Sequence, residues 1–223
     1  MNRKELILKT SPYLAGLAFA LIVFIVTMLY LGKDPISGLL HLVVSPLGSP
    51  HALSLTLVYA SMLLPASTAF LIGLRGGFIN IGIEGQLYFG AFLAYLFSML
   101  LGSYLGVFSA LLGALLGGIL WVLPPLFLKV RFGISEVFVT MVLNFISPLI
   151  VNWAVTGPFR DPSVAHPQSL PIPENARLPV IAWGKLHIGV VLAFLLGLLP
   201  YFLLKKTVLG LYIKAVGANP TAA

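Results

Sequence analysis

The chain has 223 residues, of which 59% are hydrophobic and 9% charged, and its formal net charge is +7. A water-soluble domain has about 25% charged residues and needs a polar surface, so this composition excludes a soluble fold and predicts a protein sheathed by a lipid bilayer. The sequence has no cysteine, which excludes disulfides, thiolate nucleophiles and sulfur-based metal sites within these residues.

Five or six segments are long and apolar enough to cross a bilayer, because about twenty residues rising 1.5 Å each span a hydrocarbon core of roughly 30 Å. The expected spans are about 13–31, 53–74, 78–101, 105–128, 137–156 and 187–204. The first run is too long for the apolar core of a cleaved signal peptide, so we expect it to be retained. The fold class is therefore an all-α polytopic membrane protein, with a single transmembrane domain over residues 1–223. Only Arg75-Gly76-Gly77 separates the second span from the third, which leaves open a broken or re-entrant geometry there.

The basic residues predict an orientation rather than a nucleic-acid surface. With the N-terminus inside, nine Lys and Arg residues fall in the cytoplasm and four outside, in agreement with the positive-inside rule. The cytoplasmic set is Arg3, Lys4, Lys9, Arg75, Lys129, Arg131, Lys205, Lys206 and Lys214, and the external set is Lys33, Arg160, Arg177 and Lys185.

The two longer external connections differ in character. Between Ile36 and Leu47 apolar residues recur at helical spacing, which predicts a short helix lying in the headgroup region. Residues 157–186 contain six prolines, which exclude a regular helix and predict a stiff, extended external loop. A docking surface for a partner and a plain connector remain alternatives for this loop.

Polar residues follow one another along one face of the fifth span. Glu136, Thr140 and Asn144 are four residues apart, and Ser147 follows, so they share a face of an otherwise apolar helix. Polar groups at membrane depth are costly unless they face protein or water. A hydrated solute path is the functional interpretation, which we favour for Asn144, and hydrogen bonding between helices is the structural one. Glu136 lies at the helix entrance, where the helix dipole alone would stabilise a carboxylate.

The segment from Asn80 to Gln86 places an acid, two amides and two glycines where the first turns of the third span are expected. On a helix, Asn80 and Glu84 would share one face, with Gly82 and Gln86 on roughly the opposite one. The glycines would permit close helix approach, and the amides could bind a polar solute or a neighbouring backbone. An ion pair between Glu84 and Arg75 is the structural alternative.

No pattern of catalytic or metal-binding residues stands out. The four histidines are scattered and never four residues apart, so we expect no metal site. The sequence has no GxxxxGK[ST] loop, and we therefore expect no ATP bound through a P-loop. On the fourth span, tight helix packing accounts fully for a stripe of small residues. Its members are Gly106, Ala110, Gly113 and Gly117.

Three motifs, in order and over nearly the whole chain, resemble one family. RGGFINIGIEGQ (75–86), FGISEVFVTMVLNFI (132–146) and GLYIKAVGANPTAA (210–223) resemble permease subunits of binding-protein-dependent ABC importers for nucleosides and simple sugars, the ribose-type family. The NIGxEGQ form looks more like the nucleoside-type branch than the ribose or branched-chain amino-acid branches.

The resemblance implies a type II-like ABC importer permease fold, with about ten helices in the full family, so a chain with six spans looks C-terminally truncated. It implies that residues 205–223 form a cytoplasmic coupling segment, which docks in a groove of the ATPase. The residues that match this segment are Lys214, Gly217, Asn219 and Pro220. Together with the polar patterns above, it gives a set of residues expected along the substrate path, namely Asn80, Glu84, Gln86, Glu136, Thr140 and Asn144.

The resemblance also implies partners and a location. Two cytosolic ATP-binding-cassette subunits would bind the ATP, a second homologous or identical permease would complete the path, and an extracytoplasmic binding protein would deliver the solute. The chain itself would be no enzyme and hold no cofactor. It would be a multi-pass protein of the prokaryotic cytoplasmic membrane, with its N-terminus inside, working by alternating access.

Two other classes remain as alternatives. An ion-coupled secondary transporter usually keeps ionisable residues deep in the membrane, and here only Glu84 and Glu136 qualify, both near expected helix starts. The second alternative is a membrane subunit that has a role in assembly and does not itself transport a solute. An intramembrane enzyme would need a paired nucleophile and base, or a metal cluster, at depth, and the sequence offers neither.

Overall fold

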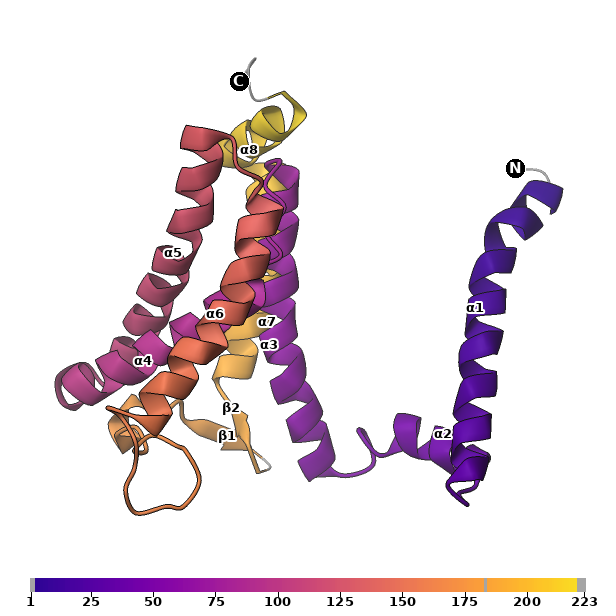
Figure 1. The fold of residues 1–223 in the computed structure, drawn as a ribbon, viewed down its shortest axis with the longest axis horizontal. Coiled ribbons are helices and arrows are strands. Elements are labelled where there is room, and N and C mark those ends of the chain that lie inside the picture. The colour runs from indigo at the N-terminus through magenta and orange to yellow at the C-terminus, as the bar shows by residue number, and fades with distance from the viewer. Residues whose placement is uncertain (1–2, 183, 220–223) are drawn as a thin grey trace. The chain divides into compact units, whose positions relative to one another are not determined.

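The computed structural model describes residues 3–182 and 184–219, with side chains from Ser11 onward. The elements, in chain order, are α1 (Arg3–Tyr30), α2 (Pro35–Val44), α3 (Pro50–Arg75), α4 (Ile83–Leu105), α5 (Val107–Phe132), α6 (Glu136–Thr156), the 3-10 turn η1 (Glu174–Ala176), β1 (Val180–Ala182), β2 (Leu186–His187), α7 (Gly189–Lys206) and α8 (Val208–Ala218) (Figure 1). They form two compact units, one of residues 1–57 and 183–185 and one of residues 58–182 and 186–223.

Six described helices are long and apolar enough to cross a membrane, which confirms the predicted all-α, six-span fold class. They are Ser11–Tyr30 within α1, then α3, α4, α5, α6 and α7. Most ends differ from the predicted ones by a few residues, as helix ends predicted from sequence do. The third span is the exception, because α4 begins at Ile83 and not at Phe78.

The smaller unit contains α1, α2 and the first part of α3. The Asp34 carboxylate starts α2 by accepting hydrogen bonds from the backbone N–H groups of Ile36 (3.3 Å) and Ser37 (2.8 Å), with Pro35 in the first turn. Hydrogen bonds from the Ser37 side chain and backbone lower the pKa of Asp34 below its ordinary value. No residue of α2 is buried, so this short apolar helix has the exposure expected of one that lies against a bilayer.

The larger unit is a helical bundle in which α4 and α5 approach most closely. A Cβ added to Gly113 would lie 2.4 Å from the carbonyl oxygen of Leu93, and one added to Gly117 would lie 2.7 Å from the Cα of Gly90. The stripe of small residues on α5 therefore lets two backbones touch, as the sequence predicted. Such close contact gains dispersion energy, which is the main attraction between helices when lipid removes the hydrophobic drive.

Burial in this protein is inverted relative to a soluble one. Among the described side chains six hydrophobic residues are buried, and they are Trp121, Ala154, Ala176, Val190, Ala193 and Leu204. Nine polar or charged residues are buried as well, and they are Ser54, Ser61, Asn80, Ser98, Ser109, Glu136, Thr140, Ser147 and Asp161. Large apolar side chains lie outside, for example Phe108 at 77% and Phe145 at 72% exposure, as a protein solvated by acyl chains requires.

In its described residues, 157–182 and 184–188, the proline-rich connection between α6 and α7 contains no α-helix and is held by local hydrogen bonds. The Asp161 carboxylate accepts from the Ser163 hydroxyl (2.6 Å) and backbone N–H (2.9 Å), and these bonds lower the pKa of Asp161. The Asn175 side chain donates to the carbonyl oxygen of Gly102 at 2.6 Å, which fastens the loop to the end of α4. β1 and β2 pair antiparallel just before α7.

A valine at position 117 tests the close packing of α4 on α5. The Gly117→Val side chain would meet the Gly90 backbone, and overpacking of this kind costs about 1–3 kcal/mol. We expect a thermal unfolding midpoint several degrees lower for the purified protein in detergent. Gly118→Val is the matched control, because a Cβ there has no other atom within 4 Å. Equal midpoints for the two variants would contradict the packing.

Candidate functional site

The predicted path residues of α4 lie at a break in the helical structure. α3 ends at Arg75, Gly77 has a positive φ of 76°, and the chain then runs without helix until α4 begins after Gly82. Figure 1 shows this segment passing back beside α6. The prediction that Asn80 lies in the first turn of a spanning helix, on one face with Glu84, is therefore wrong. Glycines at 76, 77 and 82 disfavour a helix there, and side chains of α6 hydrogen-bond the backbone of Ile79, Ile81 and Gly85 instead.

Asn144 of α6 pairs with the backbone of the non-helical residues 78–82, which we call the extended segment, and with the start of α4. Its Oδ1 accepts from the N–H of Gly85 at 2.7 Å, and its Nδ2 donates to the carbonyl oxygen of Ile81 at 2.8 Å. The first N–H groups of a helix have no partner within it, and the N-cap Gly82 offers no side chain. Asn144 thus caps α4 from another helix. This agrees with the structural interpretation of the polar face, hydrogen bonding between helices.

Glu136 and Lys129 bind the backbone at the N-terminal end of the same segment. The Glu136 carboxylate accepts from the N–H of Ile79 at 3.2 Å and from Lys129 Nζ at 2.5 Å. Lys129 Nζ also donates to the carbonyl oxygen of Gly77 at 2.8 Å. Because Glu136 and Asn144 are eight residues apart, the segment follows α6 for about 12 Å at 1.5 Å per residue. Side chains of α5 and α6 thus pair part of the backbone of the connection between α3 and α4.

Glycines at the break allow the partners to come close. A Cβ on Gly82 would lie 2.9 Å from Thr140 Cβ, and one on Gly85 would lie 2.7 Å from Trp121 Nε1 and 3.0 Å from Asn144 Oδ1. Thr140 is buried and donates to the carbonyl oxygen of Val137 in its own helix. The space between Gly82, Thr140 and Trp121 leaves no room for a water molecule. In this conformation they form packed structure and enclose no solute cavity.

The other three predicted path residues, Asn80, Glu84 and Gln86, have side-chain polar atoms without a hydrogen-bond partner in the described part of the chain. Asn80 is 8% exposed and its Oδ1 accepts from the N–H of Gly82, but its Nδ2 has no acceptor among the described residues. Gln86 and the exposed Glu84 make no side-chain hydrogen bond there, and the described residues show no ion pair between Glu84 and Arg75. Asn80 and Gln86 border a groove of about 600 Å³ whose remaining lining, from α3, the segment after it, α4 and α5, is apolar.

The predicted coupling residues lie on and after α8, a short helix that the sequence did not predict. Gly217 packs against the end of α3, since a Cβ there would lie 2.2 Å from the carbonyl oxygen of Arg75. Lys214 is exposed, and Asn219 is the C-cap of α8. Pro220 lies outside the described residues. α8 thus contacts the beginning of the connection that leads to the extended segment.

Sequence reasoning did not identify Lys129, Trp121 and Gly85 as parts of this site. Lys129 was assigned to the positive-inside pattern, although its ammonium binds Glu136 and Gly77. Trp121 stacks on Phe89 with ring centroids 4.4 Å apart, and its buried Nε1 has no partner within the described residues. No spacing in the sequence connects these positions, because they meet only when α4, α5 and α6 pack.

Comparisons with known proteins agree with the motifs. A family model for the permease component of branched-chain amino acid transport systems matches residues 51–223. The glucose ABC transporter permease protein TsgB13 of Haloferax volcanii is 29% identical over 96% of this chain and 59% of its own. The guanosine ABC transporter permease protein NupP of Bacillus subtilis is 29% identical over 67% of this chain and 44% of its own.

A third relative is aligned over the whole of this chain. The nucleoside ABC transporter permease protein NupB of Lactococcus lactis subsp. cremoris is 27% identical over 100% of this chain and 64% of its own length. The chain thus spans between 44% and 64% of the length of these three relatives. No solved structure matches the chain significantly.

Replacing the capping amide tests whether Asn144 is structural. Asn144→Leu leaves the buried Gly85 N–H and the Ile81 carbonyl without their side-chain partner, and an unpaired polar group away from water costs about 1–3 kcal/mol. We expect a loss of roughly 2–4 kcal/mol of stability, measured as a lower unfolding midpoint in detergent. Asn152→Leu, an exposed asparagine on the same helix, should be near neutral. A variant of unchanged stability that has lost only transport would instead identify Asn144 as a path residue.

Removing one partner of the ion pair tests the second attachment. Lys129→Met leaves the buried Glu136 carboxylate without its counter-ion, and because the lysine is 34% exposed we expect about 1–3 kcal/mol of destabilisation. Adding Glu136→Gln should recover part of this loss, because the amide oxygen still accepts from Ile79. Arg131→Met, which removes an exposed cation two residues away, is the control. Strictly additive effects of the two substitutions would refute the coupling.

Proposed function

The chain belongs to the family of permease components of branched-chain amino acid transport systems, and from that premise we propose that it forms part of the path of an ATP-driven importer for a nucleoside or simple sugar. The observation that carries the proposal is the non-helical connection between α3 and α4, which side chains of α5 and α6 hold. Non-helical backbone among membrane helices is tolerated where it is buried in protein or lines a path, and transporters use such segments to contact solutes.

The two groups of predicted path residues have different roles in this proposal. Glu136 and Asn144 position the extended segment, since they hydrogen-bond its backbone, and Thr140 packs against Gly82. Asn80, Glu84 and Gln86 face the solute, since they retain polar atoms without partners in the described chain. The groove beside Asn80 and Gln86, at about 600 Å³, falls in the range of small-molecule sites.

The substrate class follows from this chemistry and from the relatives. Amide groups in an apolar groove suit a neutral, hydrogen-bonding solute better than a charged one. The relatives carry names for glucose, guanosine and nucleoside transport. A nucleoside is the first candidate, because the NIGxEGQ motif looks more like the nucleoside-type branch, and a simple sugar is the second.

The contact between α8 and α3 offers a route for coupling. Two cytosolic ATP-binding-cassette subunits would bind α8 and the residues after it, and would hydrolyse the ATP. Gly217 touches the backbone of Arg75, and four residues further on the chain is hydrogen-bonded to Glu136. A displacement of α8 would therefore be passed to the extended segment through backbone contacts.

The remaining partners and the location belong to the same proposal. A second permease subunit would close the groove, and an external binding protein would deliver solute at the proline-rich loop. The protein would lie in a prokaryotic cytoplasmic membrane with its N-terminus inside, because the ends of α3, α5 and α7 that carry basic residues face the cytoplasm under the positive-inside rule.

Uptake by the intact transporter tests the function. Cells or proteoliposomes that contain the permease with its partner subunits should accumulate a labelled nucleoside or sugar in the presence of ATP. Uptake should stop with vanadate and continue with a protonophore. Uptake that survives vanadate and stops with the protonophore would establish the ion-coupled alternative, and no uptake of any nucleoside or sugar would refute the proposal.

A substitution at Gly217 tests the coupling route. Gly217→Val would force α8 away from Arg75, so we expect ATP hydrolysis to continue while uptake falls at least about tenfold, the equivalent of 1.4 kcal/mol. The ratio of solute transported to ATP hydrolysed is the measurement. Gly16→Ala is the control, because a Cβ at that position has no other atom within 4 Å. An unchanged ratio in Gly217→Val would exclude this contact from coupling.

A further inference from the structure

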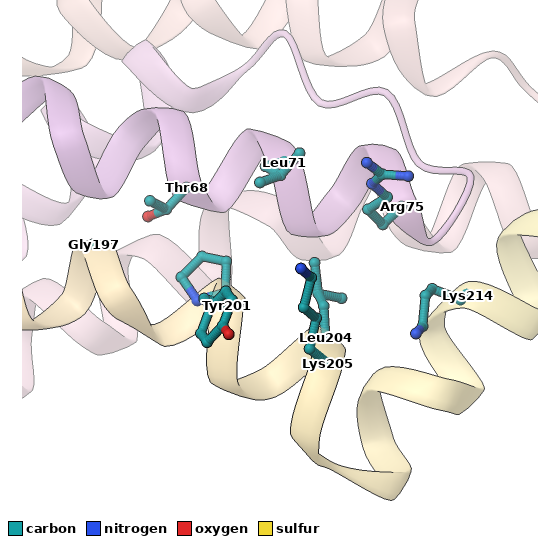
Figure 2. A pocket seen from close by; sticks show the side chains of 9 residues that line it. Thr68, Leu71, Arg75, Gly197, Tyr201, Leu204, Lys205 and Lys214 are labelled. Atoms are coloured by element: carbon teal, nitrogen blue, oxygen red, sulfur yellow. The ribbon is translucent and has the colours of Figure 1, made fainter.

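We propose that the basic end of the larger unit binds the phosphate headgroup of an anionic phospholipid. The site is the basic pocket, a cavity of about 420 Å³ between α3, α7 and α8. Its cations are Arg75, Lys205 and Lys214, and its apolar walls include Leu71, Tyr201 and Leu204. Figure 2 shows these side chains around the space between α3 and the corner of α7 and α8.

Three positive charges meet at this pocket from three helices. Arg75 is the last residue of α3, Lys205 lies in the last turn of α7, and Lys214 belongs to α8. The ion pair found among the described residues joins Lys129 to Glu136, so no described carboxylate neutralises the three. Like charges gathered without a counter-ion are costly, and an anion bound between them would remove that cost. The pocket therefore favours an anionic ligand.

The apolar walls favour a lipid over a free anion. Leu71 is 39% and Tyr201 is 53% exposed, so an apolar surface continues from the pocket along the outside of the bundle. The ammonium of Lys205 lies 5.1 Å from the centroid of the Tyr201 ring, which fixes the cation at the boundary between the two surfaces. A free phosphate would use only the cations, whereas a phospholipid would also lay its acyl chains on the apolar surface.

The depth of the pocket also fits a headgroup. Arg75 and Lys205 end spanning helices, and residues at such ends lie at the level of the lipid headgroups. Basic pockets between helices on the cytoplasmic side commonly bind anionic headgroups. The assignment to the cytoplasmic leaflet rests on the orientation in the proposed function, but the binding chemistry does not depend on transport.

A headgroup in this pocket would connect the parts proposed to couple ATP hydrolysis to transport. It would bridge Arg75 on α3 and Lys214 on α8, and Gly217 of α8 packs on the same residue of α3. We therefore expect anionic lipid to stabilise the contact between α8 and α3.

Lipid binding to the purified permease tests the proposal. In mixed micelles, phosphatidylglycerol should bind and raise the unfolding midpoint, whereas phosphatidylethanolamine of the same chain length should have a much smaller effect. The triple variant Arg75→Gln, Lys205→Gln, Lys214→Gln should bind phosphatidylglycerol far more weakly, by roughly fivefold for each cation removed. All three side chains are exposed, so the variant should fold, and circular dichroism checks this.

The control and the competing ligands make the test decisive. Lys206→Gln removes a cation next to Lys205 that does not line the pocket, and it should retain full binding. Displacement of the lipid by millimolar inorganic phosphate would identify a free-phosphate site and overturn the proposal. Undiminished lipid binding in the triple variant would also overturn it, whether or not that variant still binds its ATP-binding-cassette partner. None of these readouts requires uptake, so a failure of the transport proposal is distinguishable from a failure of this one.

Discussion

The rest of the structure depends on one constraint: side chains of α6 hydrogen-bond the backbone of the non-helical residues between α3 and α4. Within a bilayer no water satisfies the N–H and C=O groups that a helix break releases, and each orphan is costly. Glu136 accepts from Ile79, and Asn144 serves both Ile81 and Gly85. These two side chains stabilise residues 78–82 outside a helix, and in this arrangement Asn80 lies beside a groove.

Small residues make this arrangement sterically feasible. Gly82 and Gly85 let α6 and Trp121 approach the break, Gly113 and Gly117 let α5 touch α4, and Gly217 lets α8 touch α3. In lipid the apolar side chains gain little from burial against one another, so close backbone contact and hydrogen bonds hold the bundle together. The same contacts connect α8 to the extended segment, so packing and the proposed coupling share one set of residues.

The sequence predicted the helices well and the break less well. Apolar runs of sufficient length located all six spans, because a helix must pair its own backbone to cross lipid. The apolar run continues through Phe78 and Ile79, so the third span was predicted to begin too early. α8 was not predicted as a helix. The polar face of α6 was predicted correctly as a face, but its partners belong to a segment that periodicity described as helix.

The sequence by itself determined that these residues belong to a membrane protein and contain about six apolar segments long enough to span, with polar residues on particular helix faces and motifs in a recognisable order. It could do so because composition and periodicity are local properties. Only the tertiary structure decided what those polar residues do. Lys129 pairs with Glu136 seven residues on, and Asn144 reaches Ile81, 63 residues away. Contacts of that kind depend on which helix faces meet, and helix faces meet only when the bundle packs.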